Sequence, residues 1–455
     1  MWANPWPRRH IESGRHQVCD EKTQLTPSTD ARLRYLARMK FACCSGLAAV
    51  SLVAACGSSG GAASNASPSE AGTDASASTY IPYAPDASLA PVTGLTANAW
   101  VWTPVTGTMC RDGSQTGFAV NLASPPSNNL VIYLEGGGAC VDEFFCSPLA
   151  SPTTFGESQF SSWQGDATGD ANSGIFNRGD TANPVAGWNF VYIPYCTGDI
   201  FTGNRTNVTV PKVSMVQQFV GYTDVGLDLD RIVPTFPGVQ KVLLTGISAG
   251  GFGASANYVQ TARHFGSTPV YLLDDSGPPM EAPYLAECMQ SQFASLWGMD
   301  GALADCGSDC SNPDSYFVDF AKHLGKAYPT VPFGLIESSQ DAVISLFFGY
   351  GNPGNCVGSD LPGASVPGAT FTEGLQVTEE QLAGTSNFGS FILGGSRNMQ
   401  HTSLGSSSTF DGDTTNVTAS LLVPDGGTDE DAGTIALTTW ITTLVNDGKV
   451  SNVGP

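Results

Sequence analysis

The stretch KVLLTGISAGGFGAS, residues 241–255, places a serine between glycines directly after an apolar segment. Residues 246–250 match the pattern G-x-S-x-G, with a buried strand predicted before the serine and a helix-forming segment after it. Glycines are needed on so sharp a turn because flanking side chains would collide. The turn lifts the Ser248 hydroxyl to the carboxyl edge of a sheet. It predicts a nucleophile, with the N–H of Ala249 at a helix N-terminus facing a developing oxyanion.

From about residue 81 the chain alternates short apolar segments with segments of helical spacing, the pattern of an α/β sheet with covered faces. Strands are predicted at 129–137, 188–196, 240–248, 268–276, 331–339 and 388–395, and helices at 250–266 and 315–327. Residues 141–187 and 345–387 are rich in Gly, Pro, Ser and Asn, and they are too long for plain connections. We therefore expect an α/β fold of the α/β-hydrolase type, with a mostly parallel sheet, helices on both faces and long insertions over the substrate face.

A serine hydroxyl needs a base within hydrogen-bond reach, usually a histidine held by a carboxylate. After residue 56 the histidines are His264, His323 and His401. His264 lies about four turns along the helix that begins at the serine, too far to return to it. His323 lies on a predicted surface helix. His401 follows the last predicted strand and is the candidate base.

The acid is expected on a loop after a late strand, in the chain order Ser…Asp…His. Asp341 fits this order because it lies just past the strand at 331–339. Asp274 and Asp275, one strand earlier, are the rival acids. The segment YLEGGGAC, residues 133–140, ends a strand in three glycines and offers backbone N–H groups for the second half of an oxyanion hole. It lacks the spacing of the Gly-rich nucleotide-binding patterns.

The N-terminal region has the features of targeting and tether segments. Residues 39–56 combine Met-Lys, a short apolar run and small residues before Cys56, as in a signal peptide. VAAC at 53–56 resembles a bacterial lipobox, which implies lipid on Cys56 and a lipoprotein of the outer membrane or cell envelope. An ordinary secretory signal is the alternative. Residues 1–38 are interpreted as a non-native extension upstream of Met39, 57–80 as a flexible linker, and 81–455 as the catalytic domain.

The charge balance excludes nucleic acid as a partner. After residue 56 the chain has 11 Lys and Arg against 37 Asp and Glu, a net charge of −26. No basic face is available to neutralise phosphates. The acidic segment at 423–434 lacks the ligand alternation of a calcium loop, so a solvated loop is the preferred interpretation.

The cysteines agree with export to an oxidising compartment. Past Cys56 there are eight, Cys110, Cys140, Cys146, Cys196, Cys288, Cys306, Cys310 and Cys356. An even number without a CxxC pair, and without a histidine at zinc spacing, favours disulfides over a metal site. We expect no metal and no organic cofactor.

Five motifs occur in a fixed order: YLEGGGAC, YIPYCTGDIFTGN (192–204), GISAGGFGA (246–254), DDSGPP (274–279) and QDAVISLFFG (340–349). With them the chain, over roughly residues 95–450, resembles the pectin acetylesterase and Notum family of α/β-hydrolases. The family consists of serine esterases that remove acetyl groups from pectin or, in animals, a fatty acyl group from a signalling protein. The chain departs from it at Ala139, where relatives often carry an aromatic residue, and around His401.

The resemblance implies roles for individual residues. By the family pattern Ser248 is the nucleophile, Asp341 the acid and His401 the base. The resemblance further implies oxyanion donors at Gly137, Gly138 and Ala249, and the disulfides Cys110–Cys196 and Cys140–Cys146. The pairing among Cys288, Cys306, Cys310 and Cys356 stays open.

Together these features predict an exported, monomeric serine carboxylesterase that removes acetyl groups from polysaccharide through an acyl-serine intermediate. A lipase or acylprotein deacylase acting on longer acyl esters is one alternative, because the stretch ISLFFGY (344–350) could line an apolar pocket. A non-catalytic carbohydrate-binding surface protein is another.

Overall fold

The computed structural model describes the part of the chain that holds the predicted catalytic residues. The described residues are 90–148, 150–165, 170–312, 315–351, 356, 365–385, 387–417, 433–446, 448 and 450–455. The predicted upstream extension (1–38), signal peptide with Cys56 (39–56) and linker (57–80) lie outside them. So do residues 423–432 of the acidic segment.

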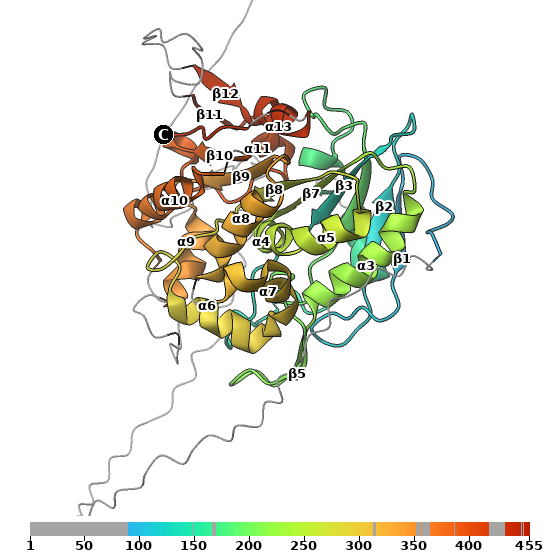
Figure 1. Cartoon of the computed structure of the whole chain (residues 1–455). Helices are drawn as coiled ribbons and strands as arrows, with labels where there is room; N and C mark the ends of the chain where they lie inside the picture. Colours follow the sequence, from blue (N-terminus) through green and yellow to red (C-terminus); the bar gives the residue numbers. More distant parts are fainter. Residues whose placement is uncertain are drawn as a thin grey trace, which may run out of the picture. The chain divides into compact units, whose positions relative to one another are not determined.

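An eight-stranded sheet runs through the fold in the order β1-β2-β4-β3-β7-β8-β9-β10. Its strands are β1 (Trp100–Pro104), β2 (Gly117–Asn121), β3 (Asn129–Leu134), β4 (Asn189–Ile193), β7 (Lys241–Ile247), β8 (Val270–Asp275), β9 (Phe333–Ser338) and β10 (Phe388–Leu393). β2 pairs antiparallel with β1 and β4, and the other neighbours pair in parallel. The six predicted strands are all present, and β1 and β2 extend them as an antiparallel edge. β7 therefore lies at the centre of the sheet, between β3 and β8 (Figure 1).

Both faces of the sheet are buried, because alternate residues of each strand enter different hydrophobic clusters. In β3, Leu130, Ile132 and Leu134 pack in one cluster, which also includes residues of α3, α5 and α8. Val131 and Tyr133 pack in the other, which includes residues of α13. The strands thus read as continuous apolar runs, as expected for a parallel sheet covered on both sides.

Helices follow most of the parallel strands. They are α2 (Glu157–Gly165), α3 (Gly221–Thr235), α4 (Ala249–Ala256), α5 (Tyr258–Phe265), α6 (Glu287–Phe293), α7 (Asp300–Cys306), α8 (Tyr316–Ala327), α9 (Ala342–Phe348), α10 (Gly368–Leu382), α11 (Ser407–Phe410) and α13 (Leu437–Val445). The helix predicted at 250–266 is two helices, divided at Asn257. Its side-chain amide donates to the carbonyls of Phe201 and Gly253.

The segment 345–387 is less irregular than its composition suggests. It contains the 15-residue helix α10, whose residues Phe371, Leu375 and Leu382 are buried. Their spacing places them on one side of a helix, so packing against the core outweighs the glycines at 368 and 374. The short pairs β5 (Arg205–Val208) with β6 (Gln217–Phe219), and β11 (Thr414–Asn416) with β12 (Thr434–Ala436), form two small sheets.

Four disulfides are present, each within the described residues. Two are the pairs that the family resemblance implies, Cys110–Cys196 and Cys140–Cys146. The cysteines whose pairing the sequence leaves open are joined as Cys288–Cys356 and Cys306–Cys310. The Cys140–Cys146 bridge closes the loop that follows the three glycines.

Candidate active site

Ser248 occupies a strained corner between β7 and α4. Its backbone has φ 55° and ψ −120°, a conformation that L-residues rarely adopt. Small neighbours make the corner possible: a Cβ on Gly250 would lie 2.0 Å from the carbonyl oxygen of Leu134, and one on Gly246 would lie 2.3 Å from the carbonyl oxygen of Gly250. The corner places Ser248 at the carboxyl end of the central strand, as the sequence predicts.

Asp341 is hydrogen-bonded to His401. Its Oδ2 lies 2.7 Å from the histidine Nδ1. Its Oδ1 accepts the backbone N–H groups of Val343 and Ile344, at 2.7 and 2.8 Å, so the carboxylate also caps α9. The Asp341 side chain is fully buried and the imidazole is 18% exposed. A proton held on Nδ1 by the carboxylate leaves the Nε2 lone pair for proton transfer.

The rival acids have different partners. Asp274 accepts a hydrogen bond from the hydroxyl of Ser255 on α4, at 2.8 Å. The Asp275 side chain accepts the backbone N–H groups of Ser403 and Leu404, both at 2.7 Å, and its backbone carbonyl accepts the N–H of Ser248 at 2.7 Å. Asp275 therefore joins the serine corner to the loop that carries His401. Burial raises its pKa to about 6, although these hydrogen bonds act in the opposite direction.

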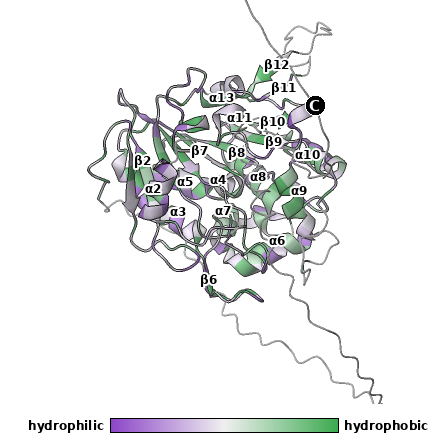
Figure 2. Ribbon diagram, turned by 180° about the vertical axis from the view of Figure 1, so that it is seen from behind, coloured by the Kyte–Doolittle hydropathy of each residue, from purple (hydrophilic) through white to green (hydrophobic). Residues whose placement is uncertain are grey.

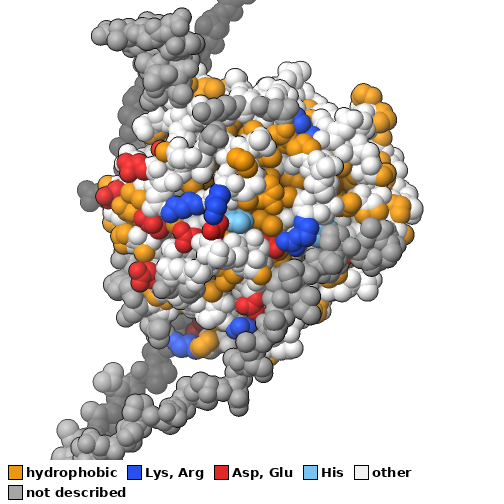
Figure 3. Space-filling view, viewed as in Figure 1, with side chains coloured by type: hydrophobic (Ala, Val, Ile, Leu, Met, Phe, Trp, Pro, Cys, Tyr) orange, Lys and Arg blue, Asp and Glu red, His pale blue; other side chains and the backbone are white. Residues whose placement is uncertain are grey.

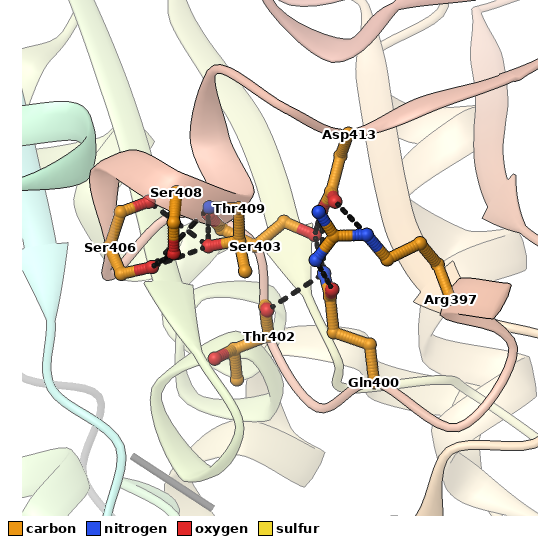
Figure 4. Close-up of polar contacts among 8 residues, drawn as sticks. All are labelled: Arg397, Gln400, Thr402, Ser403, Ser406, Ser408, Thr409 and Asp413. Atoms are coloured by element: carbon orange, nitrogen blue, oxygen red, sulfur yellow. Dashed lines mark hydrogen bonds and ion pairs between the residues drawn. The ribbon is translucent and has the colours of Figure 1, made fainter. Parts of the chain in front are cut away.

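A second buried carboxylate, Asp413, also holds the histidine loop (Figure 4). It accepts hydrogen bonds from the hydroxyl of Ser403, at 2.7 Å, and from the amide of Gln400. Arg397 Nε lies 3.6 Å from its other oxygen. The same Gln400 amide donates to the carbonyl of Thr402 at 3.3 Å. The residues on both sides of His401 are thus anchored, which limits the positions that the imidazole can take.

The three glycines after β3 pack tightly beside Ser248. A Cβ on Gly136 would lie 3.2 Å from the Ser248 Cβ, which places this segment against the nucleophile. A Cβ on Gly137 would lie 2.5 Å from the Tyr195 ring, and Gly138 has φ +74° with its Cβ position 2.2 Å from the Ala150 carbonyl oxygen. Larger residues would displace the segment, so it can bring backbone N–H groups close to an ester carbonyl at Ser248.

Sequence reasoning missed several residues that shape the site, namely Asp275 as a link between loops, Ser276, Gln400 and Asp413. Ser276 accepts the N–H of Thr402 at 3.1 Å. Asp275 and Ser276 lie in the motif DDSGPP, but the motif does not show that they bind the distant residues 402–404. No local motif marks Gln400 or Asp413. In the described ranges, no group of three or more His, Cys, Asp or Glu side chains is arranged to hold a metal ion.

The strand order, with a serine corner at the end of the central strand and an Asp–His pair after later strands, defines an α/β-hydrolase. A family model described as Pectinacetylesterase matches residues 95–342. The chain belongs to this family. The match includes Ser248 and ends just after Asp341, so His401 lies beyond it.

Individual relatives are distant. Pectin acetylesterase 11 of Arabidopsis thaliana is 25% identical over 244 residues, 52% of this chain and 60% of the plant protein. Palmitoleoyl-protein carboxylesterase NOTUM of Drosophila melanogaster is 31% identical over 159 residues, 33% of this chain and 22% of the fly protein. The chain therefore spans less than two thirds of these relatives. A crystal structure of the Wnt deacylase Notum from Drosophila has 20% identity and a TM-score of 0.46, covering 67% of this chain and 86% of the other.

Proposed function

We propose that this protein is a serine carboxylesterase that removes acetyl groups from polysaccharide. The observation that carries the proposal is the 2.7 Å bond between Asp341 and His401, on a loop tied through Asp275 to the strained corner of Ser248. This arrangement supplies a base, its orienting carboxylate and a serine at the carboxyl edge of the sheet, the parts that nucleophilic acyl transfer requires.

The reaction follows from these positions. Ser248 Oγ attacks the ester carbonyl while His401 Nε2 takes the hydroxyl proton. The N–H groups of Ala249, Gly137 and Gly138 stabilise the oxyanion of the tetrahedral intermediate. The intermediate collapses to an acyl-serine and expels the sugar oxygen, which receives the proton from His401. Water, deprotonated by His401, then attacks the acyl-serine. As this second tetrahedral intermediate collapses, His401 returns the proton to Ser248 Oγ and the carboxylic acid is released.

Charge favours a neutral polymer as substrate. The net charge of −26 after residue 56 repels demethylated pectin, although salt screens exposed charges beyond ~8–10 Å. On the face drawn in Figure 3, Lys and Arg lie in small separate groups beside Asp and Glu rather than along a track. Neutral acetylated polysaccharide or highly methylated pectin therefore fits better. The names of the plant relatives, pectin acetylesterases, agree with this class.

A second candidate is an esterase for longer acyl chains. The helix after Asp341, α9, is strongly hydrophobic (Figure 2). Its Val343 is 38% exposed, and Met399, two residues before His401, is 53% exposed. Exposed apolar side chains close to the Asp–His pair in sequence can contact an acyl chain. The fly relative is named a palmitoleoyl-protein carboxylesterase.

Export and lipid anchoring at Cys56 are part of the proposal, as is action as a monomer. The four disulfides support an oxidising compartment. In the part of the chain that the structure covers, no helix is long and apolar enough to cross a membrane.

The test is hydrolysis of p-nitrophenyl acetate, butyrate and octanoate by the wild type and Ser248→Ala. We expect the acetate to be cleaved best and kcat to fall about 10⁴-fold or more in the variant, because the nucleophile is lost. Ser255→Ala, on the same helix, is the control and should retain activity. Faster cleavage of octanoate would favour the second candidate. Equal rates for wild type and Ser248→Ala would refute both candidates and leave carbohydrate binding as the alternative.

A further inference from the structure

Arg111 is a fully buried cation that the proposed mechanism does not use. Its guanidinium donates to the backbone carbonyls of Cys146, at 2.9 Å, of Pro152, at 3.1 Å, and of Ser151. It also donates to the side-chain oxygen of Gln217 at 3.2 Å. All of these acceptors are neutral. Burial lowers the pKa of Arg111 to about 10, so the side chain is still charged at neutral pH.

The backbone of Arg111 is anchored to two other segments. Its N–H donates to the carbonyl of Cys196 at 2.9 Å, and its carbonyl accepts the N–H of Gln218 at 3.0 Å. The preceding residue, Cys110, forms a disulfide with the same Cys196. The guanidinium therefore extends from a backbone that is fixed on both sides.

The carbonyls that this guanidinium binds belong to the loop that packs against the proposed oxyanion donors. A Cβ on Gly138 would lie 2.2 Å from the carbonyl oxygen of Ala150, and one on Gly137 would lie 3.1 Å from Cδ of Pro152. Ala150 and Pro152 are the two neighbours of Ser151. The segment that the guanidinium holds is thus the segment that contacts the two glycines.

The other end of the glycine segment is held close to Arg111 as well. Cys140 is joined to Cys146 by a disulfide, and its N–H donates to the carbonyl of Gly198 at 2.7 Å. A Cβ on Gly198 would lie 2.8 Å from Cδ of Arg111, which shows how closely this backbone approaches the arginine side chain. The arginine therefore contacts the segments on both sides of the glycines.

We propose that Arg111 is a positioning residue that holds the backbone N–H groups of Gly137 and Gly138 where the oxyanion forms. Such donors act only when they are fixed at roughly 2.7–3.1 Å from the developing charge. Arginine suits this task because its planar fork of N–H groups reaches several carbonyls at once, whereas the donors of a lysine share one atom. The inference rests on the proposed roles of Ser248 and the two glycines.

The test compares Arg111→Met and Arg111→Lys with the wild type on p-nitrophenyl acetate. We expect kcat per folded molecule to fall about 10–100-fold in Arg111→Met, with KM within about two-fold, because displaced donors stabilise the oxyanion less. Arg111→Lys keeps the charge without the fork and should be intermediate. The acid limb of the pH profile should stay in place, since the bond between Asp341 and His401 is unchanged.

A trifluoromethyl ketone measures the oxyanion site directly, because its addition to a reactive serine leaves an oxyanion. Its affinity should fall in Arg111→Met by the same factor as kcat/KM. Loss of stability alone would not produce this match.

Arg178→Met is the matched control. Arg178 donates to the carbonyls of Ala186 and Trp188, at 2.7 and 2.8 Å, and to the side chain of Asn121, and burial lowers its pKa to about 10. These partners are not among the nearest neighbours of the glycines at 137 and 138. The control should lose stability and keep kcat within a few-fold.

Two results would overturn the proposal: wild-type kcat and ketone affinity in Arg111→Met, or equal losses of both in Arg178→Met. If Arg111→Met does not fold, Gln217→Leu decides, because it removes only one acceptor of the guanidinium. Its kcat should fall about 3–10-fold with KM unchanged. An unchanged kcat in Gln217→Leu would then refute the positioning role.

Amide hydrogen exchange without substrate separates this inference from the proposed function. Residues 136–140 should exchange faster in Arg111→Met than in the wild type or in Arg178→Met. If that pattern appears in a protein that hydrolyses no ester, the positioning role stands and the proposed function fails. If the wild type hydrolyses esters and Arg111→Met matches it in exchange and in kcat, the inference fails alone.

Discussion

At the scale of single residues, the site is decided by which carboxylate faces which partner. Asp274 and Asp275 are consecutive in β8, so their side chains point to opposite faces of the sheet. Asp274 bonds Ser255 of α4, whereas Asp275 bonds the backbone of the histidine loop. Asp341 lies beyond the end of β9 and reaches the His401 ring. Three aspartates close to the serine in the fold thus have three different partners.

Asp341→Asn should lower kcat about 10³–10⁴-fold on p-nitrophenyl acetate. An amide can donate to Nδ1 and so favours the tautomer with the proton on Nε2, where the base needs its lone pair. Asp274→Asn is the matched control, because it is also buried at the end of a strand, and it should stay within a few-fold of the wild type. Similar losses in both variants would contradict the assignment of the acid.

At the scale of elements, the site joins the β7–α4 corner to the loop between β10 and α11. Asp275 of β8 connects them, and Asp413 holds the loop through Gln400 and Ser403. Both carboxylates are buried, so their hydrogen bonds are shielded from water and hold the loop more firmly than surface contacts would.

Asp275→Ala should lower the free energy of unfolding by about 2–4 kcal/mol, because the N–H groups of Ser403 and Leu404 lose their acceptor inside the protein. It should also reduce kcat more than it changes KM, since His401 is no longer held in place. Urea unfolding and steady-state kinetics measure the two effects. Asp275→Asn retains an accepting oxygen, so its free energy of unfolding and its kcat should both fall less than those of Asp275→Ala. Full stability in Asp275→Ala would refute the linking role.

At the scale of the whole molecule, several carboxyl groups of the described residues are buried. Burial raises the pKa of six of them: Asp199, Asp224, Asp228, Asp274, Asp275 and Glu337. Between an unfolded pKa of about 4 and the raised folded value, the folded protein binds more protons than the unfolded chain. The stability that these six protonated carboxyl groups contribute is fully present below about pH 4. It is lost as the pH rises through the folded pKa of each group, which is about 6 for Asp275.

We therefore expect a melting temperature several degrees higher at pH 5 than at pH 8. Asp275 alone accounts for roughly 1.4 kcal/mol of this difference, because pH 5 lies inside its titration range. His264 acts in the opposite direction, because burial lowers its pKa, but it is one group against six. Differential scanning calorimetry from pH 4 to pH 9 measures the slope. Asp228→Asn, which removes one titrating group, should flatten it. A melting temperature that rises with pH over this range would contradict the prediction.

The sequence by itself determined the parts of the protein that depend on local chemistry. The apolar runs predicted the six strands of the parallel sheet, and the glycines around Ser248 predicted the corner, because only small residues fit so sharp a turn. The shortage of histidines and the order of the strands selected His401 and Asp341. These signals are contained in short segments, so they can be predicted from the sequence without knowledge of the tertiary structure.

Only the tertiary structure decided which distant groups meet. The antiparallel edge of β1 and β2, the helix α10 in a segment rich in glycine and proline, and the pairs Cys288–Cys356 and Cys306–Cys310 all depend on packing between remote segments. The same is true of the hydrogen bonds that Asp275 and Asp413 make to the loop of His401. Hydrogen bonds between buried groups depend on which groups lie close together in three dimensions. The spacing of residues along the chain does not predict this proximity.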